Sequence, residues 1–187
     1  MSKKPLHLVG LFPELMQISN PALRERVEVL WQRLWQECKW QRLEDVPVSS
    51  KIHRSHLPHA QAVVRLAAVA ADVAEQVHHL PVDRDILIAA AIVQDAGKLV
   101  EYEPDNNGTG FKRGELGVQL QHSMYAAHVA LEIGLPLEVV HIMLAHSPST
   151  SLTPQSRECA LLFWIDQLDL SAMGEKTWQR ELFHQHH

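Results

Sequence analysis

The sequence of 187 residues predicts an all-helical, all-α fold. Apolar residues recur at helical spacing in several long segments, capping residues stand at their ends, and no segment alternates as a confident strand does. Asn20-Pro21 begins the first helix, because asparagine is a favoured N-cap and proline is favoured at the first helical position. The apolar spacing continues to about Trp40, and the tryptophans of this segment favour core packing or a dimer contact.

Two further helices are expected at about 58–77 and 83–96, with Pro81 between them. The apolar stripe of the earlier helix is wide enough to predict burial on most of its sides. Residues 86–93 of the later helix are apolar all round, which predicts that this helix is central in the fold.

The second half of the chain predicts three helices and one long irregular stretch. The helices cover about 120–133, 136–145 and 153–173; Gly134 ends the first of them, and Thr153-Pro154 begins the last. Residues 101–117 are rich in turn-forming residues, and loops of this length are usually functional or mobile.

These elements divide the chain into three parts. We expect an N-terminal helical extension (1–50), a main domain (51–173) and a polar C-terminal tail (174–187).

The composition, with 46% apolar and 21% charged residues, is typical of a globular protein. A net charge of −5 disfavours a surface built for long nucleic acid. No stretch resembles a signal peptide or is long enough to span a bilayer, and two cysteines are too few for a disulfide scaffold. The sequence therefore predicts a cytoplasmic protein without a membrane partner, and it leaves a homodimer open.

Five candidate site residues lie at helix ends or within apolar helices. They are His59, Asp95, His122, His146 and Asp166. A carboxylate in an apolar helix is costly unless it is paired or bound to a cation. One or two divalent cations held by imidazoles and carboxylates would account for both acids.

The segment 89–98, Ala-Ala-Ala-Ile-Val-Gln-Asp-Ala-Gly-Lys, resembles the signature of the HD-domain superfamily. In that family an apolar helix ends in His-Asp, a small or apolar residue, Gly and Lys. His59 and the segments 122–127, 142–147 and 165–172 resemble the family's other motifs, in the family's order. The resemblance covers about 55–173 and implies a helical bundle with a metal centre in its core.

The resemblance also implies the ligands. A first ion would be held by His59, Gln94, Asp95 and Asp166, and a second ion by Asp95, His122 and His146. Gln94 departs from the family, which has His there; its neutral amide oxygen is a poorer donor than imidazole for a transition metal. The ion, one or two per chain, could be Mn, Fe, Zn, Ni or Mg.

The activity implied is metal-dependent hydrolysis of a phosphomonoester or phosphodiester in a small substrate, a nucleotide being one option. Asp95 and Lys98 are the candidate catalytic residues; Lys98, Lys112 and Arg113 are the candidate phosphate partners. His53 and His56 could take the place of His59.

Two alternatives to a hydrolase remain open at this point. Some proteins of this fold hold two irons and oxidise a substrate with dioxygen, although the missing imidazole at Gln94 disfavours iron. A catalytically decayed binding or regulatory protein is the other alternative. Gln94 favours that reading, whereas the survival of both acids and the three histidines disfavours it.

Overall fold

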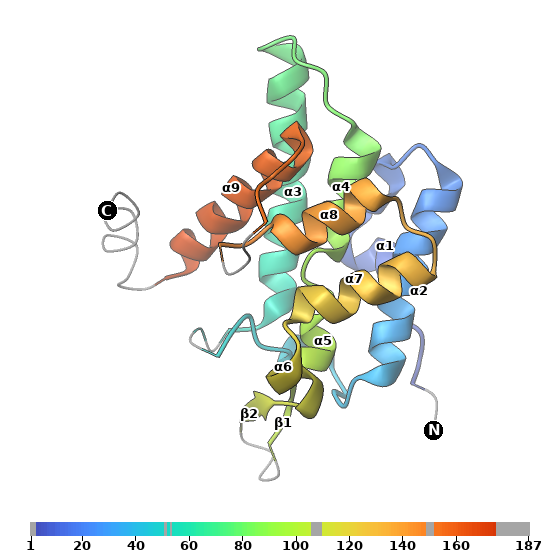
Figure 1. Cartoon of the computed structure of the whole chain (residues 1–187), viewed down its shortest axis with the longest axis vertical. Coiled ribbons are helices and arrows are strands. Elements are labelled where there is room, and N and C mark those ends of the chain that lie inside the picture. Colours follow the sequence, from blue (N-terminus) through green and yellow to red (C-terminus); the bar gives the residue numbers. More distant parts are fainter. Residues whose placement is uncertain (1–2, 51, 53, 106–109, 149–151, 175–187) are drawn as a thin grey trace.

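The chain forms a helical bundle with a small β-hairpin at one end (Figure 1). The computed structural model describes residues 3–50, 52, 54–105, 110–148 and 152–174. The helices are α1 (Leu8–Leu11), α2 (Pro21–Glu37), α3 (His56–Gln76), α4 (Arg84–Val93), α5 (Lys98–Glu101), α6 (Glu115–Gln119), α7 (His122–Glu132), α8 (Leu137–Ala145) and α9 (Arg157–Met173). Two 3-10 segments (Pro13–Gln17 and Leu43–Asp45) and two strands, β1 (Tyr102–Pro104) and β2 (Phe111–Arg113), complete the described elements.

Helix α4 is the centre of the bundle, as its apolar sequence predicts. It packs against α2, α3, α8 and α9, and every residue from Leu87 to Val93 is buried. Because α4 ends at the middle of the core, the residues that follow it, Gln94 and Asp95, are also buried. The turn after α4 thus places two polar side chains, Gln94 and Asp95, in the interior of the bundle.

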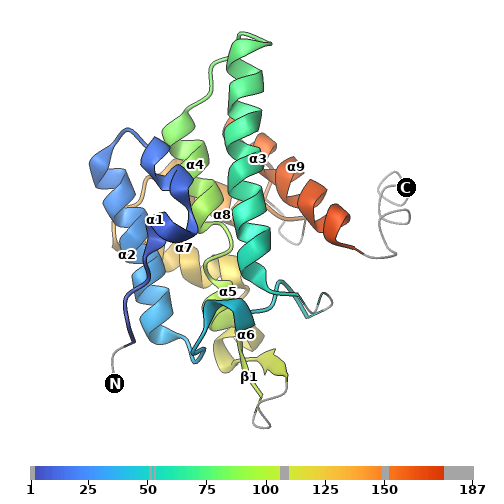
Figure 2. The ribbon, with the colours of Figure 1, turned by 180° about the vertical axis from the view of Figure 1, so that it is seen from behind.

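The described part of residues 1–50 packs into the same hydrophobic core as the later helices. Helices α1 and α2 lie on one side of α3 and α4, while α9 lies on the other side of α3 (Figure 2). The indole of Trp31 is fully buried in α2 and donates a hydrogen bond of 3.0 Å to the carbonyl of Ile92 in α4. Trp35 and Trp40 are buried as well.

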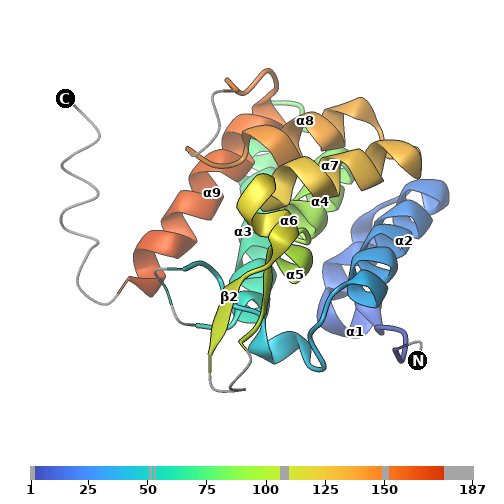
Figure 3. The same ribbon diagram turned by 60° about the horizontal axis from the view of Figure 1, so that its bottom comes forward.

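The expectation of an irregular stretch over 101–117 is wrong. Strands β1 and β2 pair in antiparallel register, with Tyr102 opposite Arg113, and α6 follows them (Figure 3). Of the turn-forming residues, Pro104 lies in β1, and the amide of Asp105 donates a hydrogen bond of 3.1 Å to the carbonyl of Gly110. The rings of Tyr102 and Phe111 pack edge to face at 5.5 Å, a contact that stabilises so short a hairpin.

Several helix ends also differ from the predicted ones. The Asn20 cap and the turn at Gly134, whose φ is +77°, are confirmed. Helix α9 begins later than predicted, because Ser156 rather than Thr153 is its N-cap; the Ser156 hydroxyl accepts a hydrogen bond from the Cys159 amide. No helix among the described residues is long and apolar enough to cross a membrane. Of the predicted tail, residues 175–187 lie outside the described residues.

Candidate metal centre

The ends of several helices converge on the turn after α4. His59 lies in the first turns of α3, His122 begins α7, His146 follows α8, and Asp166 lies within α9. All of them approach Asp95, whose side chain is buried in the turn between α4 and α5. The structure thus brings together residues that are more than a hundred positions apart.

The two carboxylate oxygens of Asp95 face different groups. Oδ1 lies 3.1 Å from Nε2 of His122 and 3.4 Å from Nε2 of His146. Oδ2 lies 3.4 Å from Nε2 of His59 and 3.1 Å from Nζ of Lys98. One buried carboxylate is therefore shared between two sets of side chains.

Asp166 joins the Oδ2 side, where its Oδ1 lies 3.2 Å from Nε2 of His59. Two groups of donor atoms result, each within 4.8 Å of one another: Asp95, His122 and His146, and His59, Asp95 and Asp166. Both groups match the ligand sets that the resemblance implies, apart from Gln94.

The fit to a metal ion rests on unsatisfied polar atoms. Neither oxygen of Asp95 has a hydrogen-bond partner, nor has Nε2 of His122, although these atoms are buried at short distances from each other. Atoms about 2.1 Å from a common ion can be up to ~4.2 Å apart, so separations of 3.1 to 3.4 Å fit atoms that point at a shared ion. The residues present fit one or two divalent cations.

The outer nitrogen of each of the three histidines is held in place. Nδ1 of His59 contacts Oδ2 of Asp169 at 2.7 Å, and Nδ1 of His122 contacts Oε2 of Glu101 at 3.0 Å. Nδ1 of His146 donates to the carbonyl of Met143 at 2.8 Å. A carbonyl can only accept, so Nδ1 of His146 carries a proton, and Nε2 is the nitrogen that faces the centre. Such outer partners orient histidines that bind metals.

Charge at the centre is set by competition between burial and the carboxylates. Burial acts to lower the pKa of His59, but the contacts with Asp166 and neighbouring carboxylates outweigh it and raise that pKa to about 11. The pKa of His122 is raised in the same way, against burial, by Asp95 and Glu101. Burial also acts to raise the pKa of Asp95, yet Lys98 and the histidines hold it well below its usual range. The centre therefore favours an ionised Asp95 and positive charge beside it.

Lys98 is buried with its ammonium between two acceptors. Nζ donates to the carbonyl of Val48 at 2.6 Å and lies 3.1 Å from Oδ2 of Asp95. Burial acts to lower the pKa of Lys98, but Asp95 and other carboxylates raise it overall. Lys98 therefore neutralises one side of the shared carboxylate.

Lys112 and Arg113 lie on β2, outside this cluster. Lys112 pairs with Glu103 at 3.1 Å, and Arg113 pairs with Oε1 of Glu101 at 3.4 Å. Since the other oxygen of Glu101 contacts His122, Arg113 is connected to the centre through one side chain.

Gly97 lets α7 approach the turn that carries Asp95. A Cβ at this position would lie 2.1 Å from the backbone carbonyl oxygen of His122. Real Cβ atoms essentially never come so near to a backbone oxygen, so any larger residue at position 97 displaces the start of α7. The missing side chain at Gly97 thus allows His122 to lie close to the turn that carries Asp95.

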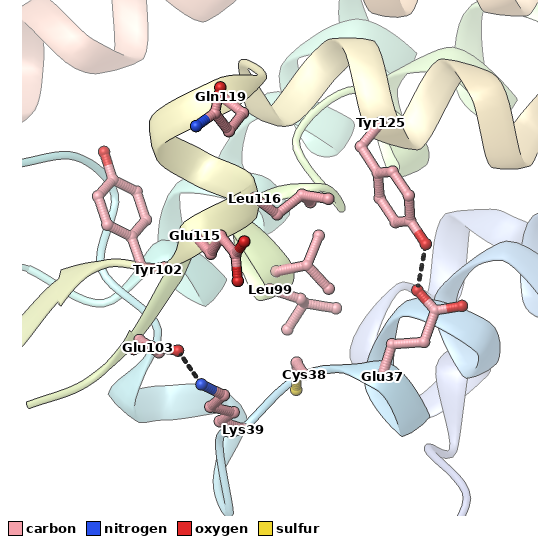
Figure 4. Close-up of a pocket in the computed structure, with 12 residues that line it drawn as sticks. Glu37, Cys38, Lys39, Leu99, Tyr102, Glu103, Glu115, Leu116, Gln119 and Tyr125 are labelled. Atoms are coloured by element: carbon pink, nitrogen blue, oxygen red, sulfur yellow. Dashed lines mark hydrogen bonds and ion pairs between the residues drawn. The ribbon is translucent and has the colours of Figure 1, made fainter.

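Two cavities border this region. The larger, about 530 Å³, lies between the end of α2 and helices α5, α6 and α7, and none of the candidate ligands lines it (Figure 4). The smaller, about 250 Å³, is lined by His59, Asp169, Arg54 and other residues at the start of α3 and the end of α9. The smaller cavity thus borders the cluster at His59, whose Nε2 lies 3.4 Å from Oδ2 of Asp95.

The sequence interpretation assigned no role to three residues that the structure brings to the site: Glu101 and Asp169 hold histidines, and Arg54 lines the smaller cavity. His56, expected only as a replacement for His59, is buried beside Asp95 together with His59. Asp169 follows Asp166 by three residues, and this spacing places both on one face of a helix. The spacing could therefore have pointed to Asp169 from the sequence. His53, the other open alternative, lies outside the described residues.

The fold and the centre define a helical protein with a candidate metal site around one shared carboxylate. Over 132 residues the chain is 30% identical to the dihydroneopterin 2',3'-cyclic phosphate phosphodiesterase of Methanocaldococcus jannaschii. The alignment covers 68% of this chain and 52% of that protein, so the chain spans about half the length of this relative. No family model matches the chain, and no solved structure matches it significantly.

Proposed function

We propose that this protein is a metal-dependent phosphohydrolase of the HD type that cleaves a phosphodiester in a small phosphorylated substrate. One observation carries the proposal. The carboxylate of Asp95 is buried, lacks hydrogen-bond partners, and has imidazole nitrogens of different helices at both oxygens. These contacts support a centre in which Asp95 would contribute to the binding of two ions.

His59, Asp95 and Asp166 would hold one ion, and Asp95, His122 and His146 the other. When bound, such ions supply a hydroxide nucleophile near neutral pH and stabilise charge on the phosphoryl oxygens. Asp169, Glu101 and the Met143 carbonyl fix the histidine rings, so that each Nε2 stays directed inwards. Lys98 holds Oδ2 of Asp95 in position and offsets the negative charge of the surrounding carboxylates.

The proposed substrate enters through the smaller cavity beside His59. Arg54 lines this cavity, and a guanidinium is suited to bind phosphate through two parallel hydrogen bonds. Lys112 and Arg113 remain further candidates, acting from the hairpin. The relative is named for the cleavage of a 2',3'-cyclic phosphate, a strained diester, and this supports testing cyclic phosphodiesters first.

The test compares three proteins loaded separately with manganese, iron, zinc, nickel or magnesium: wild type, Asp95→Asn and Asp72→Asn. Asp72 is the control, because its carboxylate pairs with Arg84 at the other end of α3. Metal content is measured by elemental analysis, and hydrolysis is measured on a nucleoside 2',3'-cyclic phosphate, bis(4-nitrophenyl) phosphate and 4-nitrophenyl phosphate.

We expect wild type and Asp72→Asn to hydrolyse at least one diester faster than the monoester, and Asp95→Asn to lose both metal and activity. A wild-type protein that binds ions but cleaves none of these esters would refute the hydrolase and favour a binding protein. Oxygen uptake by iron-loaded protein would instead favour the oxygenase alternative.

A further inference from the structure

His56 is a fourth buried imidazole beside Asp95. Its ring is 1% exposed, and its Nε2 lies 3.8 Å from Oδ2 of Asp95. This distance is too long for a hydrogen bond, and Nε2 has no hydrogen-bond partner. A buried imidazole nitrogen without a partner is unfavourable, so its position needs an explanation.

Each oxygen of Asp95 then has two imidazole nitrogens near it, and Oδ2 has the Lys98 ammonium in addition. At Oδ1, two imidazole nitrogens, those of His122 and His146, lie at 3.1 and 3.4 Å. At Oδ2, two imidazole nitrogens, those of His59 and His56, lie at 3.4 and 3.8 Å. The 3.8 Å between Nε2 of His56 and Oδ2 is below the ~4.2 Å possible for two donors on one ion. His56 is not among the donor atoms that lie within 4.8 Å of one another on this side, so ligation requires its ring to move towards His59 and Asp166.

The ring of His56 is held by contacts that do not use Nε2. The backbone amide donates to the carbonyl of Val46 at 2.7 Å, and the side chain of Ser55 caps the helix that begins at His56. The imidazole stacks on Trp31 with ring centroids 6.3 Å apart and planes at 22°. The hydrogen bond from Trp31 to Ile92 holds the indole in place, so α2 packs against the back of the His56 ring through Trp31.

Gln94 is a further side chain at this end of α4 whose polar atoms lack partners. It is 1% exposed, and neither its amide oxygen nor its amide nitrogen has a hydrogen-bond partner. An amide oxygen is a weak ligand for the transition metals that imidazole binds well. The Oδ2 side therefore needs another strong donor, and His56 is the buried imidazole within reach.

We propose that Nε2 of His56 is an additional metal ligand on the Oδ2 side of Asp95, where it acts together with His59 and Asp166. The proposal rests on the metal centre of the proposed function but not on the hydrolytic reaction. Residue 56 would thus provide the imidazole that residue 94 does not, and the N-terminal helix α2 would support a ligand directly through Trp31.

The experiment measures metal binding, not turnover. Binding of Mn²⁺ is titrated by electron paramagnetic resonance in wild type, His56→Ala, His56→Asn and the control His128→Ala, whose imidazole is exposed on α7. Circular dichroism and thermal unfolding select the His56 variant that stays folded. Spin-echo spectra of histidine-¹⁵N-labelled protein report directly on imidazole nitrogens bound to the ion.

We expect the folded His56 variant to bind one ion more weakly, by more than the roughly 10- to 100-fold that follows loss of an outer partner. Its ¹⁵N signal should decrease, whereas His128→Ala should resemble wild type. Adding Gln94→His to this variant should recover affinity. Unchanged affinity and an unchanged ¹⁵N signal would overturn the proposal. Wild type that binds ions without hydrolysing any ester would refute the proposed function and leave this measurement valid.

Discussion

The two sides of Asp95 use the same carboxylate but differ in their other donors. The Oδ1 side draws His122 and His146 from α7 and α8, which pack on each other and are close in sequence. The Oδ2 side draws His59 and Asp166 from α3 and α9, which are separated by about half the chain. Apart from the shared carboxylate, the Oδ1 side therefore has imidazole donors alone, whereas the Oδ2 side adds a second carboxylate.

This difference shows how one buried acid can serve two ions of different preference. Imidazole-rich sites suit zinc, iron and nickel, whereas added carboxylate oxygens favour harder ions such as magnesium and manganese. Lys98 approaches only the Oδ2 oxygen within the described contacts of Asp95, and it partly offsets the additional negative charge there. We therefore expect the two sides to fill at different metal concentrations.

The largest effect should come from removing a ligand of one side alone. His146→Ala should lower the affinity for the ion at Oδ1 by more than ~100-fold, because loss of a direct ligand has a larger effect than loss of an outer partner. Asp166→Asn should lower the affinity for the ion at Oδ2 by a similar factor, for the same reason. Elemental analysis and Zn²⁺ or Mn²⁺ titration measure the result. Loss of both ions in either variant would show that the two sides are a single site.

A smaller effect should follow from removing the outer partner of one histidine. Asp169→Asn should weaken the ion held by His59, and Glu101→Gln the ion held by His122, by roughly 10- to 100-fold each. These carboxylates orient the imidazole rings through Nδ1 and do not reach the ion. Competition with a metal chelator measures both affinities. If Asp169→Asn weakened the binding of both ions equally, the two sides of Asp95 would not bind ions independently.

Substitution of Gly97 should disturb the Oδ1 side through the backbone. In Gly97→Ala the new Cβ meets the carbonyl of His122 at 2.1 Å, so α7 must move and the unfolding free energy should fall by about 1–3 kcal/mol. Gly114→Ala is the matched control, because its Cβ would lie 3.4 Å from a side-chain atom of Glu103. Urea denaturation measures the change. Equal stability of the two variants would contradict the close approach.

The smallest effect concerns Asp85. Unlike the carboxylate of Asp95, its carboxylate accepts several hydrogen bonds. Asp85 accepts hydrogen bonds from the amide and hydroxyl of Ser19 and from the amide of Asn20, at 2.7 to 2.9 Å. Partial burial acts to raise its pKa, but the hydrogen bonds from Ser19 and then Asn20 lower it overall. A lowered folded-state pKa means that its stabilisation is complete above the unfolded-state pKa and is lost as pH falls through the folded-state pKa.

Asp85→Asn should therefore reduce stability at neutral pH by about 1 kcal/mol or less, because the site is partly solvated. The difference from wild type should shrink in acid, as measured by thermal unfolding between neutral pH and the acidic range. A difference that grows as the pH falls would contradict the assigned direction of the pKa shift.

The sequence alone determined the longer helices and the identity of the central one, but not the short helices α1, α5 and α6. The apolar run at 86–93, the Asn20-Pro21 start and the turn at Gly134 are local signals, because periodicity and capping depend on neighbouring residues. The same local logic singled out Asp95 and Asp166, since an acid in an apolar helix needs a partner wherever the helix packs.

Only the tertiary structure decided how those residues meet. That His59 and His122 approach opposite oxygens of Asp95, that Glu101 and Asp169 hold them, and that His56 lies beside them follow from the packing of α3, α7 and α9 around α4. Hydrophobic periodicity specifies which face of a helix is buried but not its distance from a segment a hundred residues away. Side-chain packing sets that distance, as the close contact of Gly97 with α7 does here.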